Sequence, residues 1–69
     1  MKLSARNILK GKVVKVTKGA VNSEVIIELP GGEKLVSIIT NTSVKALGLV
    51  KGRPAYAVIK ASNIMIAVD

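Results

Sequence analysis

The strongest constraint on the fold of this chain is a period of two in its apolar residues. In residues 12–18 polar and apolar side chains roughly alternate, and Val14 and Val16 are expected on one face. Residues 22–29 repeat the pattern. Alternation of this kind is typical of β-strands that are buried on one side. The sequence therefore predicts a protein built mainly from strands.

Three further segments complete the predicted set of strands. Residues 30–33, with the sequence PGGE, form a strong turn signal that joins residues 22–29 to a strand at Lys34–Thr40. Residues 54–60 and 63–68 are rich in Val, Ile and Ala and are interpreted as two more strands. The expected number of strands is therefore five.

Between the third and fourth predicted strands the period changes. Thr42 and Ser43 are suitable helix N-caps, Val44 and Leu47 are three residues apart, and Gly48 can end a short helix. Five strands with one short helix at this place follow the element order of an oligonucleotide/oligosaccharide-binding (OB) barrel. The predicted fold class is all-β: one small five-stranded OB-like barrel formed by residues 1–69.

The composition predicts a homo-oligomer. The chain has 69 residues, so it forms one domain near the lower size limit for folding alone. It is 49% hydrophobic and contains neither Cys nor His, so no disulfide or Cys/His metal site supports its small core. We expect the surplus apolar surface to lie in subunit interfaces.

The charge of the chain favours acidic partners. The net charge is +7, from eleven Lys and Arg against four Asp and Glu. Solubility alone is the simpler interpretation for most of the lysines. No apolar run approaches the ~20 residues that span a bilayer, and Arg6 and Lys10 interrupt the only apolar N-terminal segment. We expect a soluble intracellular protein with no membrane partner.

Most routes to catalysis are closed by the residue types present. Without Cys or His there is no Cys nucleophile, no Ser–His pair and no zinc site. Glu24 and Glu28 share a strand face but are roughly 13 Å apart, too far for paired acid–base chemistry. No phosphate-binding loop or dinucleotide fingerprint is present. The sequence predicts a binding protein, not an enzyme, with no metal bound by protein side chains.

One set of residues is suited to an oxyanion. Ser4, Ala5, Arg6 and Asn7 combine a hydroxyl, a guanidinium and an amide, and the nearest carboxylate in the sequence is Glu24. A fully deprotonated tetrahedral dianion such as sulfate, molybdate or tungstate needs only donors, whereas protonated phosphate also needs an acceptor. Further donors are the side chains of Thr40, Lys60 and Ser62 and the N–H groups of Ala5 and Ala61. Taken singly, a turn residue, a helix-boundary hydroxyl and a solvated strand lysine remain the simpler interpretations of Ser4, Thr40 and Lys60.

Several segments together resemble one family. The chain closely resembles the molbindins, the small molybdenum-pterin-binding (Mop) proteins, whose domain also occurs in molybdate-responsive regulators and transporter ATPases. The resemblance covers essentially the whole chain. It is carried by Ser4-Ala5-Arg6-Asn7, Lys18-Gly19-Ala20-Val21, Ser37-Ile38-Ile39-Thr40, Leu47-Gly48-Leu49 and Val58-Ile59-Lys60-Ala61-Ser62.

The resemblance implies a function and an assembly. Molbindins have an OB-type barrel and form hexamers, as a trimer of dimers, that hold molybdate or tungstate at subunit interfaces. The family's oxyanion ligands correspond to Ser4, Arg6, Thr40 and Lys60, and Ser62 matches a more variable position. A second kind of site is placed near Lys18, Gly19, Ala20 and Val21, for which a simple turn is the alternative interpretation. A domain standing alone then implies a cytoplasmic storage or buffering protein.

Two other functions are kept as alternatives. OB barrels often bind single-stranded nucleic acid, but such surfaces pair a basic groove with stacking aromatic residues, and Tyr56 is the only aromatic residue here. A nucleic-acid-binding module would show steeply salt-dependent binding. A purely structural assembly protein would be indifferent to every anion.

Overall fold

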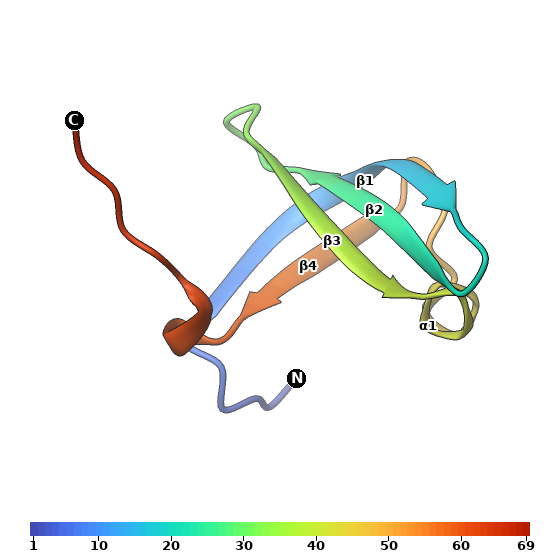
Figure 1. Cartoon of the computed structure of the whole chain (residues 1–69), viewed down its shortest axis with the longest axis horizontal. Coiled ribbons are helices and arrows are strands. Elements are labelled where there is room, and N and C mark those ends of the chain that lie inside the picture. The colour runs from blue at the N-terminus through green and yellow to red at the C-terminus, as the bar shows by residue number, and fades with distance from the viewer.

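The computed structural model describes residues 1–69 and consists of one antiparallel sheet that curls around a small core (Figure 1). The sheet has the strand order β3-β2-β1-β4, so β3 and β4 are its two edges. The all-β prediction is confirmed, but the sheet has four strands and not five. The elements in chain order are β1 (Asn7–Lys18), β2 (Asn22–Glu28), β3 (Lys34–Thr40), the helix α1 (Asn41–Leu47), β4 (Pro54–Ile59) and the 3-10 turn η1 (Ala61–Asn63).

The long strand β1 organises the sheet. The first half of its 12 residues pairs with β4 and the second half with β2. A bulge between Val13 and Lys15 inserts one extra residue into the ladder, which bends the strand. As a result Val13, not Val14, is the buried valine. Val16 packs against this core and Val14 does not, so the expectation that Val14 and Val16 lie on one face is wrong.

The core of the protomer is very small. Only four of 69 residues are buried: Val13, Val25, Ile27 and Ser23. Gly11 lets β1 approach β2 closely, since a Cβ at this position would lie 2.5 Å from Ile27 Cγ2 and 2.6 Å from the Glu28 carbonyl oxygen. So few buried residues leave most of the apolar side chains of this chain available for other contacts.

The predicted turn between β2 and β3 is confirmed. The Gly32 N–H donates to the Leu29 carbonyl at 2.9 Å, and the Leu29 N–H donates to the Glu33 carbonyl at 2.8 Å. Gly32 has a φ of 94°, a conformation that glycine adopts without steric cost. The turn therefore forms where the PGGE sequence predicts it.

The helix α1 is present, but it begins earlier than the sequence predicted. Its N-cap is Thr40, whose Oγ1 accepts a hydrogen bond from the Ser43 N–H at 3.0 Å. Thr42 and Ser43, the predicted caps, lie inside the helix because β3 runs into α1 without an intervening loop. The predicted end is confirmed, since Gly48 has a φ of 62° and closes the helix.

The predicted fifth strand, at residues 63–68, is wrong for this protomer. After β4 the chain turns through η1, and residues 64–69, here called the C-terminal arm, project away from the sheet (Figure 1). Met65, Ile66 and Val68 are 93%, 86% and 92% exposed. A strand exists only when its backbone pairs with another, and the arm has no partner within the protomer.

Candidate functional site

The first candidate group lies where the ends of β1 and β4 meet. Asn7 and Ile59 form the last pair of the β1–β4 ladder, and Asn7 Nδ2 donates to the Ile59 carbonyl at 3.3 Å. Residues just before Asn7 and just after Ile59 therefore come together at one end of the sheet (Figure 1). This terminal cluster consists of Ser4, Ala5, Arg6, Lys60, Ala61 and Ser62.

The terminal cluster presents hydrogen-bond donors that have no partner within the protomer. The N–H groups of Ala5, Arg6, Ala61 and Ser62 donate to no carbonyl, and the side chains of Arg6 and Lys60 make no hydrogen bond. All the cluster residues are exposed except Ala5, which is half-buried. Two cationic side chains, two hydroxyls and four free N–H groups make a site with the chemistry of an anion receptor.

The second candidate group lies at the opposite end of the sheet. Thr40 pairs with Asn22, and the Asn41 N–H donates to the Val21 carbonyl at 2.9 Å, so the end of β3 meets the turn between β1 and β2. In that turn the N–H groups of Ala20 and Val21 donate to no carbonyl. This turn group consists of Lys18, Gly19, Ala20, Val21 and Thr40.

The structure does not bring Thr40 to Arg6 and Lys60 within one protomer. The 12 residues of β1 separate the two groups, which lie at opposite ends of the sheet in a molecule whose longest dimension is 35 Å. The Thr40 hydroxyl also lies 2.8 Å from Ser43 Oγ and is engaged in capping α1. One tetrahedral anion cannot contact both groups of a single copy, so a shared site requires two copies of the chain.

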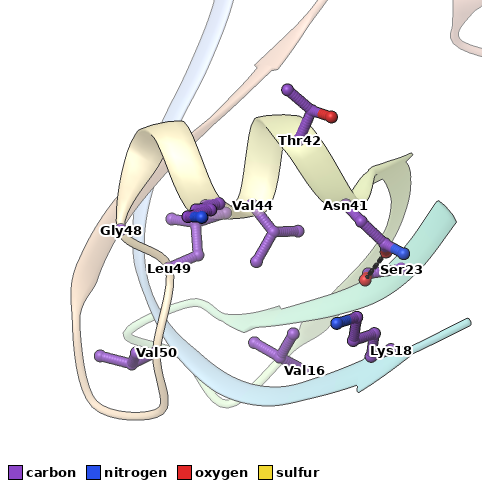
Figure 2. Close-up of a pocket in the computed structure, with 10 residues that line it drawn as sticks. Val16, Lys18, Ser23, Asn41, Thr42, Val44, Gly48, Leu49 and Val50 are labelled. Atoms are coloured by element: carbon purple, nitrogen blue, oxygen red, sulfur yellow. Dashed lines mark hydrogen bonds between the residues drawn. The ribbon is translucent and has the colours of Figure 1, made fainter. Parts of the chain in front are cut away.

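Asn41 lies beside the turn group and was not identified from the sequence. Its Nδ2 donates to the Gly19 carbonyl at 2.9 Å, and its Oδ1 accepts from the hydroxyl of the buried Ser23 (Figure 2). These bonds fix the β1–β2 turn against the first residue of α1. The only signal in the sequence was an amide side chain directly after a strand, which is too common to be informative.

Two hollows flank the sheet. Beneath α1 a cavity of about 490 Å³ has Val16, Val44 and Leu49 on its walls and Lys18 at its side (Figure 2). The second hollow, here called the β3–β4 groove, lies between the two edge strands and contains cavities of about 450 and 230 Å³. Both of these cavities are lined mainly by apolar residues and share Ile27, Ser37, Tyr56 and Val58.

The protein offers no group of three His, Cys, Asp or Glu side chains that could hold a metal ion. None of its helices combines the length and the apolar character that crossing a lipid bilayer requires.

A curled antiparallel β-sheet with one short helix defines the class of this chain as a small OB-like domain. Residues 3–66 match the family described as the TOBE domain. The chain is 52% identical over 66 residues to the "Molybdenum-pterin-binding protein 3" of Clostridium pasteurianum, and this match covers 96% of the chain and 97% of that relative. The chain belongs to the TOBE domain family, among its molybdenum-pterin-binding (Mop) members.

Solved structures agree with this assignment. MopII from Clostridium pasteurianum, in an apo form, superposes with a TM-score of 0.92 at 48% identity and covers 97% of this chain and 100% of its own. The cytoplasmic molybdate-binding protein ModG, with molybdate bound, has a TM-score of 0.91 at 51% identity and covers 94% of this chain and 46% of its own. The OB-like fold and the resemblance to the molbindins are therefore confirmed, and the named relatives are binding proteins.

Proposed function

We propose that this protein binds molybdate or tungstate reversibly in the cytoplasm, and that it stores or buffers the oxyanion without catalysing a reaction. The observation that carries the proposal is the terminal cluster, whose donors have no partner within the protomer. Relatives of this chain are named for binding molybdenum, and ModG is described as cytoplasmic and with molybdate bound. The terminal cluster of this chain supplies the cationic and hydroxyl side chains that binding of the same anion needs.

In the terminal cluster Arg6 and Lys60 supply positive charge. Ser4 and Ser62 donate from their hydroxyls, and Ala5 and Ala61 donate from the backbone. Charge-assisted hydrogen bonds of this kind are roughly twice as strong as neutral ones. Because the cluster contains no carboxylate, it offers a protonated phosphate no strong acceptor for its O–H group, and the site favours the bare dianion.

The C-terminal arm and the β3–β4 groove support a homo-oligomer. The arm carries Ile64, Met65, Ile66 and Val68, all of them exposed, and the groove exposes apolar side chains between two unpaired strand edges. The arm has six residues, close to the length of β3 and β4, which have 7 and 6 residues. We take the occupant of the groove to be the arm of a second copy, which adds a strand to the edge it meets.

Assembly also brings the two candidate groups together. Thr40 of one copy joins Arg6 and Lys60 of another at a subunit interface, in a hexamer built as a trimer of dimers. Residues 18–21 of the turn group form the second kind of anion site, where the free N–H groups of Ala20 and Val21 and the Lys18 ammonium are the donors. Anion binding across copies then stabilises the assembly by mass action.

Isothermal titration together with native mass measurement tests the proposal. We expect heat of binding from molybdate and tungstate, much weaker binding of phosphate, and no binding of a single-stranded oligonucleotide at physiological salt. The mass should be that of a hexamer. A protein that is monomeric and silent toward molybdate and tungstate would contradict the proposal, and salt-dependent oligonucleotide binding would favour the nucleic-acid alternative.

A further inference from the structure

The terminal cluster is also the hinge of the C-terminal arm. β4 ends at Ile59, the chain changes direction through η1, and the arm begins at Ile64. Lys60, the N-cap of η1, and the η1 residues Ala61 and Ser62 therefore lie between the sheet and the arm. Three of the six residues of the terminal cluster therefore determine the direction in which the arm leaves.

This hinge is weakly held within the protomer. Its backbone bonds run from the Asn63 N–H to the Lys60 carbonyl at 2.9 Å and from the Ile64 N–H to the Ala61 carbonyl at 3.3 Å. No side chain caps η1, in contrast to α1, which Thr40 caps. Every residue of the hinge is exposed. Little in the isolated protomer fixes the direction of the arm.

A bound anion changes how the charged side chains beside the hinge interact. Arg6 and Lys60 each lie one residue beyond the last pair of the β1–β4 ladder, so their like charges oppose a close approach when no anion lies between them. A dianion between them reverses this effect, since each cation is then attracted to the same centre. It also joins the segment before β1, which the Asn7–Ile59 hydrogen bond ties to the sheet, to the hinge.

We propose that an oxyanion in the terminal cluster locks the hinge and thereby holds the arm in the groove of the neighbouring copy, so that the ligand controls the rate of subunit exchange. This inference rests on the proposed function and on the seating of the arm. The ligand then acts on the lifetime of the assembly as well as on its equilibrium stability. Apo assemblies exchange subunits, and loaded assemblies keep them.

Mixing of isotopically light and heavy assemblies tests the inference, with native mass spectrometry following the mixed species over time. Coupling between two sites usually changes an affinity roughly 5- to 150-fold. Because such changes fall mostly on the dissociation rate, we expect molybdate at saturating concentration to slow mixing by a similar factor. Equal rates with and without molybdate, in a protein whose binding is verified by titration, would overturn the inference and leave the proposed function intact. Absence of binding in the titration would overturn both.

A variant with two glycines inserted between Asn63 and Ile64 separates hinge locking from general stabilisation. The insertion leaves the terminal cluster unchanged and uncouples it from the arm. We expect this variant to bind molybdate as the native protein does, while its exchange rate no longer responds to the anion. If molybdate slows subunit exchange equally in the native protein and in the variant, the coupling does not run through the hinge.

Hydrogen exchange of the native protein gives a second readout that does not depend on assembly of the variant. The Asn63 and Ile64 N–H groups should gain protection when molybdate is added, while the Gly32 N–H, in the distant β2–β3 turn, serves as the control. Unchanged protection at Asn63 and Ile64 would overturn the inference.

Discussion

At the scale of single residues, the account depends on donors that the fold leaves without partners. Arg6 and Lys60 come from opposite ends of the chain, and the β1–β4 ladder places them at one end of the sheet. Neither side chain makes a hydrogen bond within the protomer. Thr40 differs from them, because its hydroxyl already caps α1. The residues of the candidate site therefore have different structural roles, and their substitution has different consequences.

Substitution of Lys60 tests the charge of the terminal cluster. Lys60→Ala should weaken molybdate binding by at least about 1.5 kcal/mol, the lower range for hydrogen bonds to charged groups. Lys51→Ala is the matched control, since Lys51 is equally exposed but lies in the turn before β4. Titration calorimetry compares the two variants, and equal affinities would remove Lys60 from the site.

Substitution of Thr40 tests its role as a cap. Thr40→Val should lower the free energy of unfolding by about 0.5–2 kcal/mol, because the Ser43 N–H loses its acceptor. Thr42→Val is the control, since Thr42 makes no capping bond. Both are measured by urea denaturation at a fixed protomer concentration. A larger loss for Thr42→Val would mean that the helix begins where the sequence placed it.

At the scale of elements, local patterns predicted most of the fold. Alternation and turn residues located β2, β3 and β4, and Gly48 marked the end of α1. The bulge in β1 escaped prediction because it depends on register with β2, which no local pattern encodes. The prediction of a fifth strand failed for a similar reason. Apolar composition shows that a segment needs burial, but it does not show which copy of the chain supplies the partner.

Gly11 tests the close approach of β1 and β2. Gly11→Ala should lower the free energy of unfolding by about 1–3 kcal/mol, since the added methyl meets Ile27 and the Glu28 backbone. At Gly31 the same change meets only the flexible Glu33 side chain and should cost less. Denaturation of both variants decides the point, and equal losses would contradict the proposed packing.

At the scale of the whole molecule, the protomer lacks the buried surface that a stable domain of this size needs. Its four buried residues contrast with an apolar groove and an apolar arm that do not meet each other. The sequence predicted oligomerisation from this surplus. It could not predict that the candidate residues divide into two groups at opposite ends of the sheet, because their separation depends on how β1 pairs with β4 at one end and with β2 at the other.

A charge placed in the arm tests how copies associate. Ile66→Asp should dissociate the assembly, because a carboxylate cannot enter an apolar groove without a large desolvation cost. Native mass spectrometry should then detect the protomer of 7.2 kDa. Lys51→Asp, which adds a carboxylate at an exposed turn, should leave the assembly unchanged. An intact assembly of the Ile66→Asp protein would show that the arm is not the contact.

Anomalous diffraction from crystals grown with tungstate shows whether copies of this chain jointly hold a tetrahedral dianion. We expect tungsten peaks between protomers, each within hydrogen-bond distance of Arg6 and Lys60 of one copy. Peaks confined to lattice contacts, or no peak beside Arg6 and Lys60, would contradict it.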